Sequence, residues 1–123
     1  MNLFGYQHRV AQWIRTCFGS KIADHQMERN YRFLEEALEL VQALGATRQD
    51  ALDLVDYVFN RPTGEPKQEV GGVMVCLAAL CAANSISLLD AAETELTRIT
   101  DPVVMEKIRQ KHLNKPIVGA LPG

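Results

Sequence analysis

Apolar side chains recur every three or four residues along most of this chain, and glycine and proline break the pattern at intervals. The first run shows the spacing clearly, with Val10, Trp13, Ile14 and Cys17 at i, i+3, i+4 and i+7. This period places the apolar residues on one face of an α-helix, whereas a half-buried strand would alternate them. The pattern predicts six helices. Five of them cover about residues 4–18, 26–44, 66–83, 87–99 and 101–113, and the sixth begins at about residue 47 and is stopped by Pro62.

Local signals mark several of the helix ends. Gly19 follows the first predicted helix, at a position where a left-handed residue commonly closes a helix. Thr47, with Asp50 three residues later, resembles a capping box, and Pro66 suits the first turn of a helix. The segment 73–80 is apolar throughout and fits a buried strand by pattern alone. Its length and its alanine-rich end favour a helix.

The composition indicates a cytoplasmic protein. The net charge of −2 argues against a nucleic-acid binder that relies on a uniform positive field. The three cysteines form no CxxC pair, which favours reduced, packed thiols over a zinc site or a disulfide framework. We see no signal peptide at the N-terminus, and the longest apolar run, 71–83, is shorter than the roughly 20 residues that span a bilayer. We therefore expect neither a nucleic-acid nor a membrane partner.

The fold class that follows is all-α. The chain has 123 residues, 47% of them apolar, which is enough for one domain with a buried core. We expect a bundle of about five to six helices in a single domain over residues 1–115, followed by an irregular tail at 116–123. The predicted helices 26–44 and 66–83 are apolar over much of their surface, which indicates burial against a second copy in a dimer or tetramer.

Three carboxylates lie close together on the predicted helix 26–44. Glu36 and Glu39 are three residues apart and Glu35 and Glu39 are four apart, so both pairs share a helix face. A divalent cation would relieve their repulsion, and Mg²⁺ prefers oxygen ligands. The alternative is a surface ion pair, because Arg32 precedes Glu36 by one turn.

A fourth carboxylate, Glu69, opens the apolar helix 66–83. An acidic residue in a first turn also interacts favourably with the helix dipole, by about 0.3–1 kcal/mol, and this alone would account for it. Gly71 and Gly72 follow directly, although each costs roughly 1 kcal/mol relative to alanine inside a helix. That penalty predicts close approach by another helix or by a ligand.

The two acidic segments together resemble those of a known superfamily. Glu35-Glu36-Ala37-Leu38-Glu39-Leu40 and Glu69-Val70-Gly71-Gly72-Val73-Met74 are similar to the EExxE and ExxD motifs of the MazG-like all-alpha NTP pyrophosphohydrolases. This superfamily includes MazG, dimeric dUTPases, dCTP pyrophosphatases and phosphoribosyl-ATP pyrophosphohydrolase. The resemblance covers roughly residues 29–99 and implies a MazG-like, oligomeric helical fold.

The resemblance implies a hydrolase that cleaves the α–β bond of nucleoside triphosphates and releases a monophosphate and pyrophosphate. It implies Mg²⁺ as the cofactor, with Mn²⁺ as an alternative. Glu36, Glu39 and Glu69 would be the metal ligands. Glu35 would be a catalytic residue that orients the attacking water, or it would contact the metal ligands without binding the metal itself. Such chemistry needs metal-held phosphates and neutralisation of the developing charge.

The chain departs from the family pattern at one position. The aspartate of ExxD falls on Gly72, which has no ligand atom. Three outcomes are open: water fills the gap, another acid such as Asp53 or Asp56 replaces the missing ligand, or catalysis is lost.

Residues on the first predicted helix are candidates for substrate binding. His8 lies about one turn before Gln12 and Trp13, and the three side chains would line a pocket for the base. In the superfamily the first helices help to hold the nucleoside. The alternative is that Trp13 packs in the core and His8 lies on the surface, because an aromatic at helical spacing is more often a packing residue.

Cationic side chains are candidates for contact with the phosphates. Arg29 lies about two turns before Glu36, and Lys107 and Lys111 belong to a basic C-terminal segment. The alternatives are a solvated face for Arg29 and stabilisation of a helix C-terminus for the two lysines.

Two functions therefore compete. The first is a Mg²⁺-dependent nucleotide pyrophosphohydrolase acting on (d)NTPs. The second is a degenerate, non-catalytic helical module that binds a nucleotide or a protein, and Gly72 favours it.

Overall fold

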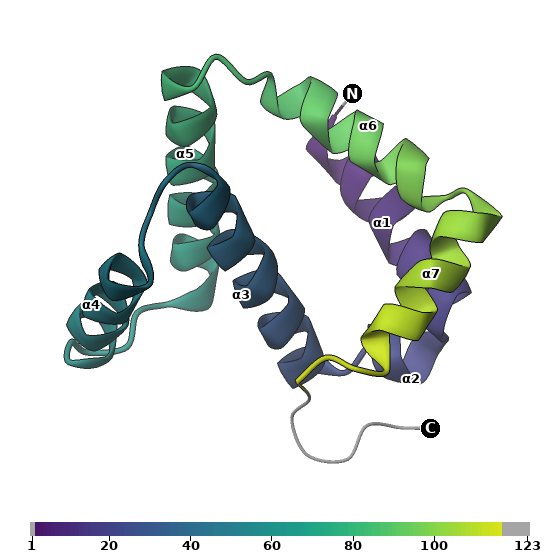
Figure 1. The fold of residues 1–123 in the computed structure, drawn as a ribbon, viewed down its shortest axis with the longest axis horizontal. Coiled ribbons are helices and arrows are strands. Elements are labelled where there is room, and N and C mark those ends of the chain that lie inside the picture. Colours follow the sequence, from purple (N-terminus) through teal and green to yellow (C-terminus); the bar gives the residue numbers. More distant parts are fainter. Residues whose placement is uncertain (1, 117–123) are drawn as a thin grey trace. The chain divides into compact units, whose positions relative to one another are not determined.

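The computed structural model describes residues 2–116, and this part of the chain is all-helical (Figure 1). Its seven helices are α1 (Leu3–Phe18), α2 (Ser20–Ala23), α3 (Gln26–Ala43), α4 (Arg48–Phe59), α5 (Pro66–Ala83), α6 (Leu88–Ile99) and α7 (Pro102–His112). The all-α prediction is thus confirmed. The ends of six helices agree with the predicted ends to within a residue or two. The exception is the end of α4, which lies at Phe59, before the predicted stop at Pro62.

The short helix α2 was not predicted. It has four residues, too few for a helical period to show in the sequence. It begins directly after Gly19, whose φ of 84° lies in the positive range that favours glycine. Gly45, with φ of 97°, ends α3 in a similar way.

The predicted helix starts have the expected local contacts. The Thr47 hydroxyl accepts from the Asp50 backbone N–H, and the Asp50 carboxylate accepts from the Thr47 N–H, so the capping box of α4 is confirmed. Hydrogen bonding of its carboxylate to the Thr47 backbone N–H, and then to the Thr47 side chain, lowers the pKa of Asp50. Asp101 likewise caps α7 ahead of Pro102.

The helices fall into two compact units, which we describe separately. The terminal unit contains the residues up to Leu34 together with those from Leu89 onward, and the central unit is Glu35–Leu88. Helix α3 contributes residues to both. The prediction of a single domain over residues 1–115 stays a prediction, and most of the predicted tail, residues 117–123, lies outside the described residues.

In the terminal unit, α1 lies beside α6 and α7 (Figure 1). Long-range hydrogen bonds join α1 to both helices. The Tyr6 hydroxyl donates to the Ala92 carbonyl, and Arg9 forms a bidentate ion pair with Glu93 at 2.8 and 2.9 Å. Arg109 of α7 donates to the Cys17 carbonyl at 2.8 Å. The buried apolar side chains here are Cys17, Ala23 and Leu96.

In the central unit, the apolar faces of α3, α4 and α5 are largely exposed. No residue of α4 is buried, and its last residue, Phe59, is 84% exposed. Only Cys81 of α5 is buried. The exposed large apolar residues of this unit are Leu38, Val41, Leu44, Leu52, Leu54, Val55, Tyr57, Val58, Phe59, Val70, Val73, Val75 and Ile86.

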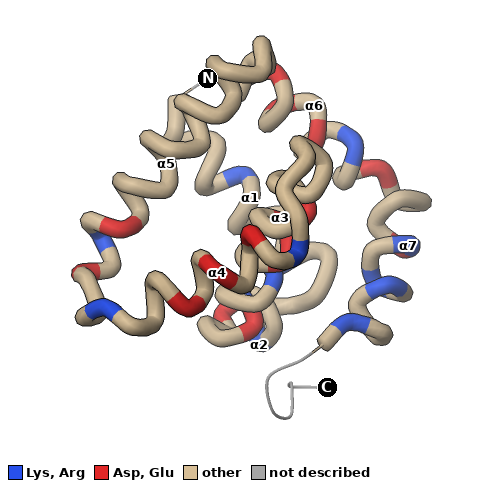
Figure 2. The backbone as a smooth tube through the Cα atoms, turned by 60° about the vertical axis from the view of Figure 1, so that its left-hand side comes forward, with Lys and Arg blue, Asp and Glu red and all other residues tan. Residues whose placement is uncertain are grey.

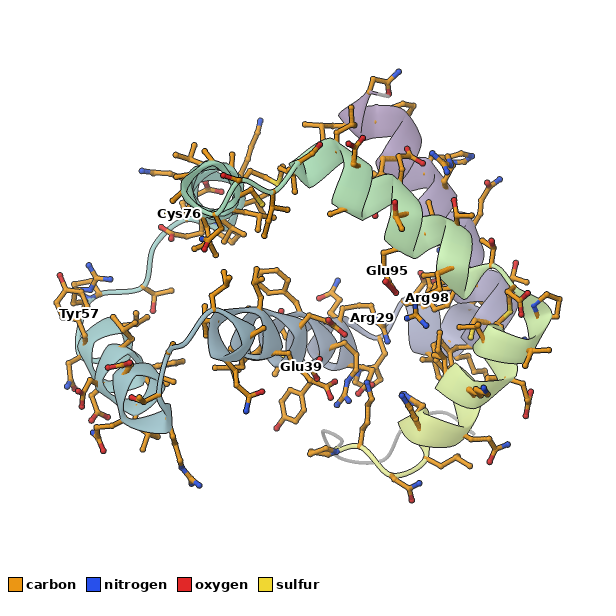
Figure 3. The ribbon with its side chains drawn as sticks, turned by 45° about the horizontal axis from the view of Figure 1, so that its top comes forward. Arg29, Glu39, Tyr57, Cys76, Glu95 and Arg98 are labelled. Carbon is orange, nitrogen blue, oxygen red and sulfur yellow. The ribbon has the colours of Figure 1, made fainter. Side chains whose placement is uncertain are left out.

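The three cysteines are free thiols, and Cys17 and Cys81 are buried as the sequence predicted, whereas Cys76 is exposed (Figure 3). In the described part of the chain, no single helix is long and apolar enough to cross a membrane; only α5 and α6, taken together across the break between them, reach that length and composition.

Candidate functional site

The first motif lies in the middle of α3, within the central unit. Helix α3 forms here because leucine, alanine and glutamate, all good helix formers, fill this stretch without a glycine or proline. Glu36 and Glu39 are exposed, and Glu35 is partly buried (Figure 3 labels Glu39). The oxygen atoms of Glu36 and Glu39 are therefore accessible to a ligand.

The second motif lies in the first turn of α5. Glu65 caps this helix by accepting hydrogen bonds from the backbone N–H groups of Lys67 and Gln68 at 3.1 and 2.8 Å. The Glu69 carboxylate lies against the loop that leads into α5, because a Cβ atom on Gly64 would meet Glu69 Oε1 at 2.6 Å. The absence of a side chain at residue 64 thus leaves room for the Glu69 carboxylate.

Within the described part of one chain, nothing approaches the two helical glycines after Glu69 closely. A Cβ atom on Gly71 or Gly72 would meet no described atom within 4 Å. Neither helix packing nor steric demand in this part of the chain therefore requires glycine at these positions. A Cβ atom fits at both positions in one chain.

The described residues of one chain gather no group of three or more histidine, cysteine, aspartate or glutamate side chains that could hold a metal ion. The chemistry of the donors suits Mg²⁺, since all four motif side chains offer carboxylate oxygens. Their arrangement in a single chain does not form the metal site that the resemblance implies. The two alternative acids of α4, Asp53 and Asp56, are exposed, and Asp53 accepts a hydrogen bond from Gln49.

The candidates on α1 belong to the terminal unit, and they differ in exposure. His8 and Gln12 are exposed. Trp13 is partly buried, and its indole N–H donates to the Ile99 carbonyl at 2.7 Å. Its ring packs edge-on against Phe18, with 6.2 Å between the ring centroids. Trp13 therefore has a packing role between α1 and α6, which was the alternative weighed from the sequence.

Arg29 does not lie on the solvated face that the sequence allowed for it. Its Nε and Nη2 atoms are buried, and burial lowers the pKa of its guanidinium. It belongs to a cluster with Glu28, Arg32 and His112, which we call the Glu28 cluster. Glu28 is the one charged or polar residue of the described chain that is classed as buried, with 0% exposed.

Sequence reasoning did not identify Glu28 or His112. The i, i+4 spacing of Glu28 and Arg32 was a signal for an ion pair, and their Oε1 and Nε atoms are 3.0 Å apart. No signal pointed to His112, because its contact with Glu28, at 3.7 Å, joins helices far apart in the sequence.

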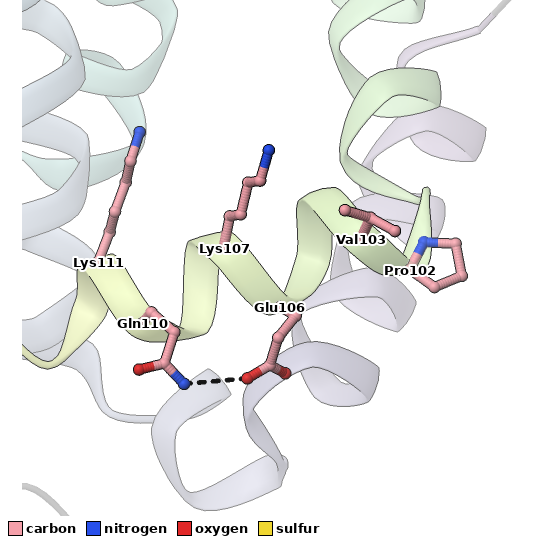
Figure 4. A pocket seen from close by; sticks show the side chains of 6 residues that line it. All are labelled: Pro102, Val103, Glu106, Lys107, Gln110 and Lys111. Carbon is pink, nitrogen blue, oxygen red and sulfur yellow. Dashed lines mark hydrogen bonds between the residues drawn. The ribbon is translucent and has the colours of Figure 1, made fainter.

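Lys107 and Lys111 lie on α7, where basic residues gather toward the end of the helix (Figure 2). Both are exposed and line a shallow, open pocket along this helix with Pro102, Val103, Glu106 and Gln110 (Figure 4). Glu106 accepts a hydrogen bond from Gln110 at 3.0 Å (Figure 4). The pocket wall consists almost entirely of carbon atoms, so the aliphatic parts of the lining side chains form it.

Comparison of the chain with protein-family models, with curated proteins and with solved structures finds no match.

Proposed function

We propose that the protein is a Mg²⁺-dependent nucleotide pyrophosphohydrolase that cleaves the α–β bond of (d)NTPs. The observation that carries the proposal is the pair of acidic motifs, Glu35-Glu36-x-x-Glu39 and Glu69, on two helices of one all-α chain. In this proposal Glu36, Glu39 and Glu69 hold the metal, Mg²⁺ or Mn²⁺, and Glu35 positions the attacking water. The fold would be MazG-like and the protein cytoplasmic.

The accessibility of the carboxylates supports this assignment. Glu36, Glu39 and Glu69 are exposed, so their carboxylate oxygens are accessible to a cation from solvent. The helix cap of α5 is Glu65, so Glu69 is not needed for capping, although its place in the first turn also suits the helix dipole. Donors that are accessible and share a helix face are suited to a cation that must also bind substrate phosphates.

A homo-oligomer is part of the same proposal. Large apolar side chains of α4 and α5 are exposed in one chain, and a concentration of exposed apolar residues commonly marks an interaction site. Because one chain alone gathers no three metal-binding side chains among its described residues, the proposal requires the acidic motifs to meet when copies assemble.

The test is a panel of NTPs and dNTPs incubated with the protein in Mg²⁺ or in EDTA, with the monophosphate and pyrophosphate measured. Hydrolysis in ¹⁸O water locates the cleaved bond, since attack at the α-phosphorus labels the monophosphate. The variants Glu36→Gln and Glu39→Gln should each lose at least about 100-fold in kcat/KM. Glu95→Gln replaces an exposed acid of α6 that is paired with Arg98; it is the matched control and should keep full activity.

The second candidate is a non-catalytic module that binds nucleotide, and Gly72 favours it because the fourth carboxylate of the family pattern is missing. Binding of a nucleotide by the wild-type protein without any release of pyrophosphate would establish this function instead. Absence of both binding and turnover would exclude both candidates.

A further inference from the structure

Helix α4 has an apolar face that is largely exposed. No residue of this helix is buried, and Leu52, Val55 and Phe59 are all exposed, Phe59 to 84%. An isolated helix shorter than about 15 residues is marginal in water, and most helices in proteins are stabilised by the packing of an apolar face. We therefore expect another surface to cover α4 in the assembled protein.

Acidic side chains continue one row of this face. Asp53, Asp56 and Phe59 follow one another at intervals of three residues, so they lie along one side of the helix. All three are exposed, and Asp53 accepts a hydrogen bond from Gln49 at 2.7 Å. The row is therefore apolar at the end of α4 and negatively charged toward its middle.

Helix α7 presents the opposite pattern. Val103, Lys107 and Lys111 follow one another at intervals of four residues on its exposed face, and the two lysine side chains extend from the same side of the helix (Figure 4). Val103 is 65% exposed, and the wall of the shallow pocket along this face is almost entirely carbon. The row is therefore apolar at the start of α7 and positively charged toward its end.

The two rows match in length and inclination when the helices are antiparallel. Phe59 and Asp53 are six residues apart, which is about 9 Å along a helix, and Val103 and Lys111 are eight apart, which is about 12 Å. The flexible four-carbon stem of a lysine spans the difference. Rows spaced by three and by four residues lie side by side in helices that cross at about 20°, the usual geometry of helical bundles.

The combination of apolar and charged side chains indicates what covers these rows. A phosphate or a nucleotide would pair with Lys107 and Lys111 but would leave Phe59 uncovered. An anionic lipid surface would attract the lysines of α7 and repel the carboxylates of α4. A second copy of the chain has both complementary rows, so one kind of contact covers both of them.

We propose that α4 of one copy docks antiparallel against α7 of a second copy. The contacts of this interface are Phe59 with Val103, Asp56 with Lys107, and Asp53 with Lys111. The apolar pair contributes burial, and the charge pairs determine the register and the partner. The inference rests on the proposed function only in that it names an interface of the proposed homo-oligomer. Association needs neither metal nor substrate, so the two proposals fail separately.

The experiment uses two charge-reversed variants of the full-length protein. One has Asp53→Lys with Asp56→Lys, and the other has Lys107→Glu with Lys111→Glu. Analytical ultracentrifugation in EDTA, at low ionic strength and without nucleotide, measures the self-association of each. Either variant alone should associate at least about tenfold more weakly than the wild type, because like charges then face each other. An equimolar mixture should form complexes that contain both variants, because contacts between unlike variants again join opposite charges.

The matched control is Asp24→Lys with Glu95→Lys, which changes the net charge by the same amount as the α4 variant. Both side chains are exposed and lie outside the two rows. This variant should sediment as the wild type does, and circular dichroism checks that every variant is folded. An equal loss of association in the control and in the α4 variant would assign the effect to net charge and overturn the inference.

Other outcomes would also overturn it. A wild-type protein that stays monomeric at about 1 mM would show that no interface of millimolar or tighter affinity exists. A mixture of the two variants that associates no better than its components would show that α4 and α7 are not in contact between copies. Binding of the wild type to phosphatidylserine vesicles that requires Lys107 and Lys111, without self-association, would assign α7 to a membrane instead.

A measurement on the unaltered protein covers the case in which a variant fails to fold. The backbone amide resonances of Asp56 and Lys107 should shift together in NMR spectra as the wild-type protein is concentrated, over the range in which sedimentation detects association. If both resonances stay unchanged while the mass of the complex increases, the interface lies elsewhere on the chain.

Discussion

The Trp13 indole N–H donates a hydrogen bond to the Ile99 carbonyl oxygen over 2.7 Å, and this contact joins α1 to the last residue of α6. Trp13→Phe keeps most of the ring packing against Phe18 but removes the donor. We expect the free energy of unfolding to fall by about 1–2 kcal/mol, because a partly buried carbonyl loses its partner. Urea titration followed by circular dichroism measures this. If Trp13→Phe were as stable as the wild type but bound nucleotide more weakly, Trp13 would be a substrate-binding residue and not a packing residue.

Gly72→Asp introduces the carboxylate that the family pattern has at this position. The substitution should be tolerated, because no described atom lies within 4 Å of the new Cβ and aspartate is a slightly better helix former than glycine. If the missing ligand limits catalysis, kcat with Mg²⁺ should rise by about tenfold or more. Gly71→Asp, one residue away on another helix face, is the control. Equal rates in Gly72→Asp and the wild type would show that this position needs no ligand.

Phe59→Glu tests whether α4 is covered by a second copy. Phe59 is 84% exposed in one chain, so a glutamate there should leave the helix intact but disfavour an apolar interface. We expect a shift toward smaller species in analytical ultracentrifugation. Phe4→Glu offers a close match, since Phe4 is 83% exposed on α1 of the other unit, and it should not change the sedimentation. The same shift in both variants would mean that α4 is not the specific contact.

Glu28→Gln removes the only carboxylate of the Glu28 cluster. The side chain is fully buried beside Arg32 Nε, and loss of one partner of a buried ion pair is costly. The free energy of unfolding should decrease by on the order of 3 kcal/mol. Glu106→Gln, which breaks an exposed pair with Arg109, should change it by less than about 1 kcal/mol. Similar values for the two variants would show that the cluster contributes little to stability.

His112 should make the protein less stable as the pH falls below its ordinary pKa of 6.5. Burial lowers the pKa of His112 in the folded state, so the unfolded chain binds a proton more readily in this pH range. Acidification therefore stabilises the unfolded chain relative to the folded protein. Stability is therefore fully present above pH 6.5 and decreases as the pH falls toward the lowered value. Urea midpoints between pH 5 and 8 measure the effect, and His112→Gln should have a flatter profile. If the urea midpoints of His112→Gln and of the wild type depended on pH in the same way, His112 would not be the cause of the pH dependence.

The helices could be predicted because their signals are local. The apolar period of three and four residues and the Thr47–Asp50 capping box act within one or two turns of the backbone, and both are confirmed. Helix α2 was missed, since four residues after Gly19 contain no full period. The acidic motifs were likewise visible as spacing along α3 and α5, but spacing alone does not tell whether Glu69 meets Glu36 and Glu39.

By itself, then, the sequence determined the six longer helices, the capping box of α4 and the spacing of the carboxylates along α3, because each depends on neighbours within about four residues. The tertiary structure decided the rest. Residues far apart in the chain, such as Glu28 and His112, enter one buried cluster, and Trp13 uses its indole N–H on Ile99. These contacts depend on how helices pack, and a pattern read along the chain has no information on which helix faces another.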